Sequence, residues 1–146
     1  MSAKDLMAIE AKTLTLKTLQ SLRTVTLASV GQDGWPDVRT MMFCPRQGLD
    51  TIHFVTSLEM KKNVRIVIDP KAVVYGYHPT TWEEFRLFGK AELIGDTETK
   101  LKIWCDELDD YFPEGAYAHN LIVIRFQTDH GEYASPDKGK GTFTID

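Results

Sequence analysis

Hydrophobic and polar residues alternate in short stretches along most of the chain, and turn-forming residues separate these stretches. Strict alternation over a few residues is typical of half-buried β-strands. The strands predicted in this way cover residues 24–30, 36–44, 51–56, 72–77, 82–94, 121–126 and 132–134. Gly89 lies inside the longest of them and indicates a β-bulge or a close approach of another backbone.

Other segments have the helical spacing of apolar residues. The first covers residues 4–22, within an N-terminal region 1–22, and the last covers residues 96–108 with Asp96 as its N-cap. Between them, a short helix is expected to begin at Thr56, in an N-cap position, and to end before Pro70. Strands outnumber helices, so the expected fold class is mostly β (α+β), a small antiparallel β-barrel with helices at its rim.

The composition is ordinary for a soluble chain of one domain, residues 1–146, with a polar tail at 136–146 that we expect to be loose. A net charge of −4 argues against a general nucleic-acid surface. No apolar run is long enough to span a membrane, and the N-terminus lacks the apolar core of a signal peptide, so the default expectation is cytoplasmic. Cys44 and Cys105 lie far apart and suggest neither a metal motif nor a disulfide framework. Cys44 is expected to be a buried thiol, and an approach of Cys44 to a cofactor is the alternative.

Basic residues gather where a negative charge would be usual. Lys61 and Lys62 fall near the first turn of the expected helix, although helix N-termini favour anions. A phosphate held by the helix N-terminus, the Thr56 and Ser57 hydroxyls and the lysines would relieve their repulsion. A solvated basic face is the alternative. Arg39 shares a strand face with apolar residues, so it either needs a partner or reaches water at the sheet edge.

The segment Thr56-Ser57-Leu58-Glu59-Met60-Lys61-Lys62 carries a family resemblance. Together with the order of elements, it resembles the split β-barrel flavoproteins related to pyridoxamine 5′-phosphate oxidase, and among them the small bacterial general-stress proteins. Thr56, Glu59 and Lys62 match the family pattern, and Lys61 replaces an arginine. Met60 departs from it, because the family has a phosphate-binding serine there.

The resemblance implies a split barrel that forms a homodimer and binds FMN in clefts between subunits. The cofactor-binding residues that it implies are Arg39, Thr56, Ser57, Lys61 and Lys62 at the phosphate, Thr40 and Met41 near the ring through their backbones, and Glu84 where the family often has a glutamine. The position of a flavin-contacting lysine falls near Phe43 and Cys44 here. Catalytic residues stay unassigned.

The resemblance favours a flavin-dependent oxidoreductase that uses a small-molecule electron donor or acceptor. The oxidase has a C-terminal set of Trp, Arg and His that reads its substrate, and residues 131–146 lack such a set, so oxidation of pyridoxamine 5′-phosphate is not expected. A non-catalytic flavin carrier or sensor, linked to stress, is the main alternative. A relative that binds heme or a deazaflavin is a third. The four histidines are scattered and predict no metal site.

Overall fold

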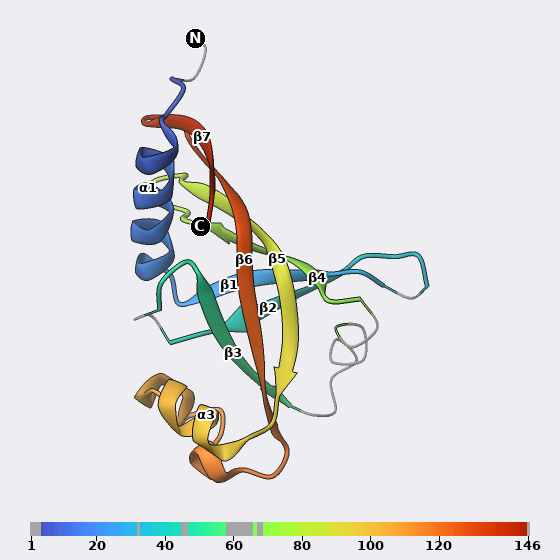
Figure 1. The fold of residues 1–146 in the computed structure, drawn as a ribbon. Helices are drawn as coiled ribbons and strands as arrows, with labels where there is room; N and C mark the ends of the chain where they lie inside the picture. The colour runs from blue at the N-terminus through green and yellow to red at the C-terminus, as the bar shows by residue number, and fades with distance from the viewer. Residues whose placement is uncertain (1–3, 32, 45–46, 58–65, 67–68, 146) are drawn as a thin grey trace.

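The computed structural model of the chain describes residues 4–31, 33–44, 47–57, 66 and 69–145. These residues form a seven-stranded antiparallel sheet with helices beside it (Figure 1). The elements are α1 (Ala8–Ser21), β1 (Thr24–Ser29), β2 (Asp37–Met42), β3 (Thr51–Ser57), β4 (Lys71–Tyr77), β5 (Glu84–Ile94), α3 (Thr97–Ile103), β6 (Leu121–Ser135) and β7 (Gly139–Thr144), with 3-10 turns at Asp106–Leu108 and Gly115–Tyr117.

The sheet curls toward a barrel without closing. Its strand order is β2-β1-β4-β5-β6-β3, and β7 pairs with β6. The two end strands, β2 and β3, meet at a single bridge between Phe43 and Phe54, and the described residues form no further ladder between them. We call the unpaired stretch beyond this bridge the split. The prediction of an antiparallel split β-barrel is confirmed.

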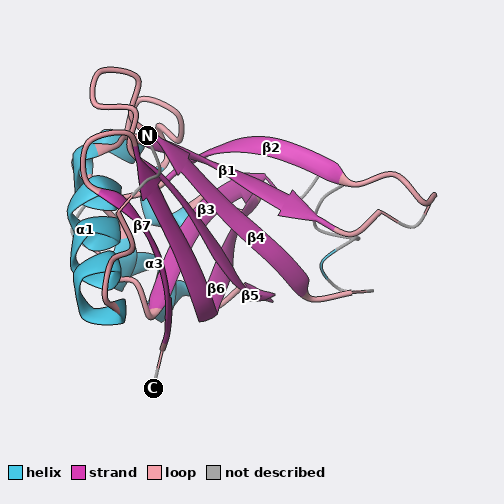
Figure 2. Ribbon diagram, turned by 90° about the horizontal axis from the view of Figure 1, so that it is seen from above, coloured by secondary structure: helices cyan, strands magenta, loops and turns pink. Residues whose placement is uncertain are grey.

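The core fills the concave side of the sheet, because alternate residues of each strand point inward. Leu27, Phe54, Leu87 and Phe126 are among its fully buried side chains. The helix α1 covers one end of the sheet beside β6 and β7 (Figures 1 and 2).

The first helix begins later than the sequence predicts, at Ala8 rather than at residue 4. The backbone just before it pairs with β7 instead: Leu6 N donates to Lys140 O at 2.7 Å, and Lys140 N donates to Lys4 O at 2.8 Å. A contact with a strand more than a hundred residues away therefore takes these residues out of the helix.

The C-terminal prediction was wrong in two ways. Residues 121–135 form one continuous strand rather than two, and residues 139–144 form β7 rather than a loose tail. The break predicted between residues 126 and 132 does not form, because β5 and β7 pair with β6 on both sides there. The ring of Phe143 packs closely over Gly131, so the glycine serves close packing instead of a turn.

The segment between β5 and β6 packs below the barrel as a separate apolar cluster (Figure 1). Asp96 caps α3 as predicted, since its carboxylate accepts from Thr99 N at 2.8 Å, but the helix ends at Ile103 rather than at residue 108. The buried members of the cluster are Val55, Leu108, Ala118, Leu121 and Val123. This cluster holds the segment 95–120 against β3 and β6.

Cys44 and Cys105 form a disulfide, so the expectation of a buried thiol was wrong. The two residues are 61 positions apart, and the fold brings their Cα atoms to 6.0 Å. This is a usual separation for a disulfide. No local pattern in the sequence could reveal a pairing that depends on how residues 95–120 fold back onto the end of β2.

The carboxylate of Glu83 connects the start of β5 with Tyr133 on β6 and with Lys138 in the turn before β7. The Glu83 side chain, just before β5, accepts from Tyr133 OH at 2.6 Å and lies 3.4 Å from Lys138 Nζ. Burial raises the pKa of Glu83, but hydrogen bonds from Tyr133 and Thr81 and the nearby Lys138 outweigh burial, so the net pKa is lowered. Tyr133 is fully buried.

Changing Tyr133 to phenylalanine should lower the free energy of unfolding by about 1.5 to 3 kcal/mol, the usual worth of a hydrogen bond to a charged group. Burial and the Glu83 hydrogen bond raise the pKa of Tyr133 from 10.0 to about 12. Its stabilising effect is therefore full below pH 10 and is lost as the pH rises through about 12. Urea unfolding between pH 7 and pH 12 measures both effects.

Tyr75→Phe is the matched control. The Tyr75 hydroxyl donates to Glu84 Oε2 at 2.8 Å, but this pair lies on the less buried side of the sheet. A smaller loss is expected there. Equal losses in the two variants, or an unchanged alkaline transition in Tyr133→Phe, would contradict the role given to the Glu83 contact.

Candidate functional site

Arg39, the first candidate, lies on β2 with its side chain toward the inner face of the sheet, in register with buried Leu27. Its side chain is 38% exposed, and its Nε donates to Asp37 Oδ2 at 3.4 Å. A guanidinium has five N–H donors in a fixed fork, so most of them stay available to an anion. Arg39 thus has both of the features that the sequence left open, a partner and access to water.

Thr56 and Met41 border the split on the inner side. They lie two residues beyond the Phe43–Phe54 bridge on β3 and β2, so they face the same side as the bridge residues. Thr56 is 6% exposed, and its hydroxyl has no hydrogen-bond partner among the described residues. A buried hydroxyl without a partner costs free energy, so this position suits a ligand that supplies an acceptor or donor.

Thr56 is not a helix N-cap, as the sequence predicted, because it lies within β3 and pairs with Ile122. The strand extends through Ser57, which points to the opposite face from Thr56. Thr40 likewise alternates with its neighbours and faces the outside of the sheet. Only backbone atoms of Thr40 and Ser57 can therefore share the inner side with Arg39, Met41 and Thr56. The backbone role that the resemblance implies for Thr40 stays a prediction.

The remaining candidate residues, Lys61, Lys62 and Glu84, are not seen beside Arg39 and Thr56. Lys61 and Lys62 lie outside the described residues. Glu84 stands on β5, on the outer face, where it accepts from Tyr75 OH at 2.8 Å and pairs with Arg86 at 3.5 Å. Arg39 and Glu84 therefore lie on opposite faces of the sheet in one chain. They can meet at one ligand only if Glu84 comes from a second copy.

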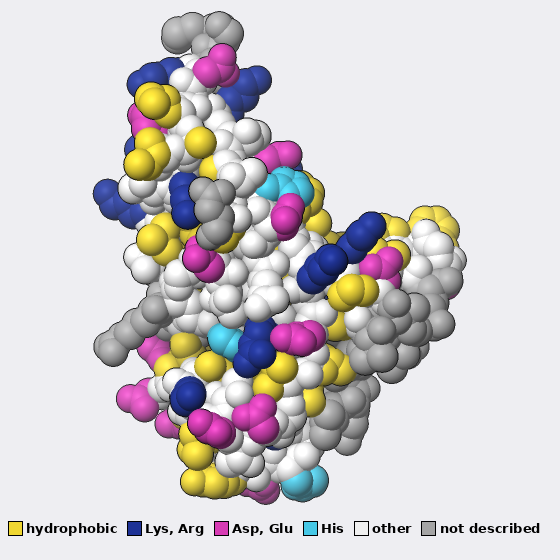
Figure 3. Space-filling model, in the orientation of Figure 1, with side chains coloured by type: hydrophobic (Ala, Val, Ile, Leu, Met, Phe, Trp, Pro, Cys, Tyr) yellow, Lys and Arg dark blue, Asp and Glu magenta, His cyan; other side chains and the backbone are white. Residues whose placement is uncertain are grey.

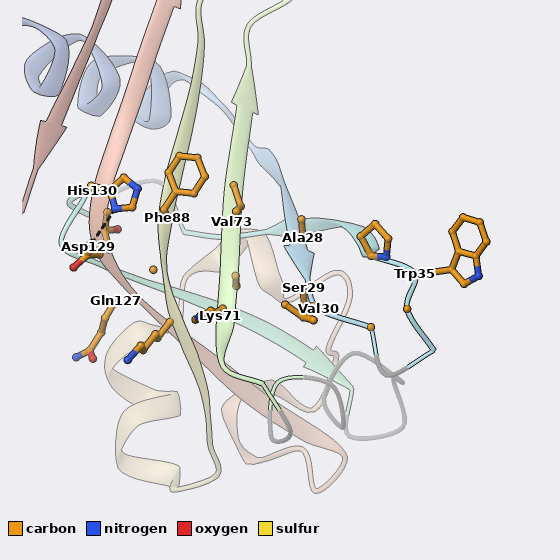
Figure 4. A pocket seen from close by; sticks show the side chains of 17 residues that line it. Ala28, Ser29, Val30, Trp35, Lys71, Val73, Phe88, Gln127, Asp129 and His130 are labelled. Carbon is orange, nitrogen blue, oxygen red and sulfur yellow. Dashed lines mark hydrogen bonds and ion pairs between the residues drawn. The ribbon is translucent and has the colours of Figure 1, made fainter.

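A groove of about 960 Å³ crosses the outer face of the sheet, and we call it the outer groove (Figure 4). Its floor follows one register row through Ala28, Val73, Phe88 and His130, on β1, β4, β5 and β6. The rings of Phe88 and His130 stack at 4.7 Å. Trp35, on the turn between β1 and β2, stands at its far end and is 75% exposed.

Two lysines rim the outer groove. Lys71 and Lys90 are directly opposite in the β4–β5 ladder, and basic side chains project over the middle of these strands beside hydrophobic ones (Figure 3). Within the described part of the chain, the side-chain ammonium group of neither lysine has an acidic partner. Like charges directly opposite repel, so an acidic group on whatever covers the groove would stabilise them.

The outer groove was not predicted from the sequence, although the sequence contains a signal for it. In residues 72–77 and 84–94, apolar residues occur on both faces: Val74 and Leu87 point into the core, while Val73 and Phe88 point outward. Strands that are apolar on both sides are typical of sheets covered on both sides. The outer face therefore has the composition of a surface that another body covers.

His53 and His130 have structural partners. His53 Nε2 accepts from Arg125 Nε at 3.2 Å, and burial, together with the Arg125 charge, lowers the pKa of His53. His130 Nδ1 lies 2.8 Å from Asp129. Among the described residues, no three His, Cys, Asp or Glu side chains gather in a way that could hold a metal ion. In this part of the chain, no helix is both long and apolar enough to cross a membrane.

Comparisons with known proteins identify the family and the fold. The family model of pyridoxamine 5'-phosphate oxidase matches residues 12–134. A Clostridium acetobutylicum protein related to general stress protein 26 of B. subtilis superimposes with a TM-score of 0.83 at 22% identity, over 92% of this chain and 94% of that chain. No curated protein matches the chain.

Two further solved structures share the fold. One is a pyridoxamine 5'-phosphate oxidase-related, FMN binding protein of Nostoc punctiforme, with a TM-score of 0.59 and 18% identity over 92% of this chain and 94% of that chain. The other is a heme binding protein of Mycobacterium smegmatis, with a TM-score of 0.71 and 14% identity over 88% of this chain and 56% of that chain. The family model covers most of a barrel that is open between β2 and β3, and the chain therefore belongs to the pyridoxamine 5'-phosphate oxidase family.

Proposed function

We propose that the protein binds FMN at the split, with the phosphate held by Arg39, Thr56, Lys61 and Lys62. The observation that carries this proposal is the buried Thr56 hydroxyl, which has no partner among the described residues and faces the split. Arg39 borders the same opening with most of its donors available. Charge-assisted hydrogen bonds of this kind hold phosphates strongly. Family membership supports a flavin as the ligand.

We also propose that the working form is a homodimer. Trp35 and Val38 are 75% and 61% exposed at one end of the outer face, next to the apolar floor of the outer groove. Exposed apolar side chains that gather in this way are typical of protein interfaces. A second copy on this face would cover them. It would also bring Glu84 of one chain to the flavin of the other, which one chain alone does not do.

When bound, FMN supplies electron transfer to and from a small-molecule donor or acceptor. The chain's own part is to hold and shield the cofactor. Arg39 fixes the negative end, Met41 and the buried Phe43 and Phe54 provide an apolar wall, and the covered outer face excludes water. An oxidoreductase of unknown substrate is the activity that this arrangement supports.

A non-catalytic flavin carrier or sensor is the second candidate. It is favoured by the side chains at the split, because the described ones are Arg39 with its partner Asp37, a hydroxyl and apolar groups, without a histidine or a free thiol among them. Turnover of bound flavin with a donor and an acceptor decides between the two. A role in stress is proposed on the name of the C. acetobutylicum protein's relative alone. Heme, which the M. smegmatis protein binds, would show its own absorption band in the same titration.

Arg39→Ala should weaken FMN binding about tenfold to a hundredfold, because it removes a charge-assisted contact to the phosphate. The measurement is quenching of flavin fluorescence on titration with protein. Arg23→Ala is the matched control, since Arg23 is exposed and precedes β1. It should bind FMN like the unchanged protein. Equal FMN affinity in the Arg39 variant and the control would refute the assignment, whereas riboflavin should bind both variants equally.

A cytoplasmic location stays part of the proposal. The disulfide makes it testable, because stable disulfides are rare in reducing compartments unless they are redox-active. Trapping the thiols in intact cells with an alkylating agent reports the state of Cys44 and Cys105. A reduced pair in growing cells is the expected result for a cytoplasmic protein.

A further inference from the structure

The Cys44–Cys105 disulfide joins the end of β2 to the segment 95–120, whose apolar cluster has its other buried members on β3 and β6. Cys44 directly follows Phe43, the bridge residue that closes one end of the split. Cys105 lies between α3 and the 3-10 turn Asp106–Leu108. The disulfide therefore joins the closed end of the split to the segment 95–120.

The end of β2 has little else to hold it toward β3. On its other side β2 has a full ladder with β1, but toward β3 it has the Phe43–Phe54 bridge. Gln47 adds a polar link, because its Nε2 donates to Cys44 O at 3.1 Å and to His53 O at 3.0 Å, and its Oε1 accepts from His53 N at 2.6 Å. Besides these non-covalent contacts to β3, the disulfide ties the end of β2 covalently to Cys105.

Both cysteines are reachable from solvent. They are half-buried and line a cavity of about 610 Å³. The walls include His53, Lys102, Trp104 and Glu107, several of which are exposed. A disulfide sealed in a core resists attack, whereas one in an open cavity can be approached by an external thiolate.

We propose that Cys44–Cys105 is a reversible thiol–disulfide exchange site that a dithiol reductant opens, and that opening it loosens the segment 95–120 and the end of β2. One thiolate of the reductant attacks one sulfur, forms a mixed disulfide and releases the other cysteine as a thiolate. The second thiol of the reductant then displaces the first cysteine. Two electrons reduce the protein, the reductant becomes a disulfide, and the released thiolates take up protons from water.

The consequence for the cofactor rests on the proposed function. Arg39 and Met41 lie on β2, so loosening its end is expected to weaken FMN binding. Coupling between two sites in one protein is typically fivefold or more. Coupling is also reciprocal, so bound FMN must make the disulfide harder to reduce by the same factor.

The test uses the full-length oxidised protein and dithiothreitol as the reductant, without denaturant. Alkylation followed by mass spectrometry counts the thiols, hydrogen exchange reports the backbone, and flavin fluorescence gives FMN affinity in both states. We expect two alkylated cysteines, about tenfold faster exchange in residues 95–120 with an unchanged β5–β6 ladder, and FMN affinity reduced about fivefold or more. The Cys44→Ser/Cys105→Ser variant should behave like the reduced protein and ignore the reductant.

The outcomes decide separately on the exchange site, on the loosening of segment 95–120 and on the coupling to FMN binding. Cysteines that stay protected without denaturant would overturn the exchange site. Cysteines that react with no change of hydrogen exchange in 95–120 would overturn the loosening of that segment. Equal FMN affinity in the two redox states would overturn the coupling. If neither state binds FMN, the proposed function fails, while thiol counting and hydrogen exchange still decide on the disulfide.

Discussion

Replacing Cys44 and Cys105 with serine should lower the free energy of unfolding by about 4 kcal/mol. The two cysteines are 61 residues apart, and a cross-link over a loop of that length removes much of the conformational entropy of the unfolded chain. The apolar cluster also holds the segment 95–120, but its buried members come from β3, β6 and the segment itself and not from β2. Urea unfolding of the variant and of the oxidised wild-type protein measures the difference.

The reduced wild-type protein is the matched control. It lacks the same cross-link but keeps both sulfur atoms, so its free energy of unfolding should agree with that of the serine variant. A loss below about 1 kcal/mol in both would show that the disulfide does not constrain the fold as the chain-entropy argument requires. A large loss in the variant alone would assign the effect to packing of the sulfurs.

Gly89→Ala should lower the free energy of unfolding by about 3 kcal/mol, which is the second of the two largest effects that we expect. Gly89 sits where the β5–β6 register shifts, at the bulge that the sequence predicted. A Cβ atom there would overlap the carbonyl oxygen of Gln127, so the strands would have to move apart. Gly89 also lines the outer groove, so the same change should disturb the proposed dimer face.

Gly95→Ala provides the comparison. Gly95 directly follows β5, the strand that contains Gly89. A Cβ atom at Gly95 would meet Ile122 Cδ1 at an ordinary distance of 3.7 Å. Its free energy of unfolding should change little, and thermal unfolding of the two variants is the measurement. Equal stability of Gly89→Ala and Gly95→Ala would contradict the close approach of the Gln127 backbone at the bulge.

Local patterns predicted most of the sheet, and contacts distant in sequence explain where they failed. Alternation located the strands because the inner face of each strand must be apolar, and Gly89 marked the bulge. The strand β7 was missed because its register is set by β6 and α1 rather than by its own glycine-rich sequence. Thr56 has the local pattern of a cap, but pairing with Ile122 extends β3 through it.

In the candidate site, too, local patterns predicted some features, and contacts between distant segments decided the others. Residue types pointed to Arg39 and Thr56, and both border the split. The sequence could not tell that Glu84 faces the opposite side of the sheet, since that depends on how β5 is placed between β4 and β6. Nor could it show that Cys44 pairs with Cys105. Both facts come from the arrangement of distant segments, and they lead to the proposed dimer and to the redox site.

Native mass spectrometry of the purified protein after addition of FMN tests the central claim most directly. The claim is that flavin is bound between two copies of a 16.6 kDa chain. We expect a species with two chains and two FMN molecules, and loss of FMN from it in Arg39→Ala but not in Arg23→Ala. A single chain that carries FMN would contradict the shared site, and a protein that takes up no FMN would contradict the flavin-binding function itself.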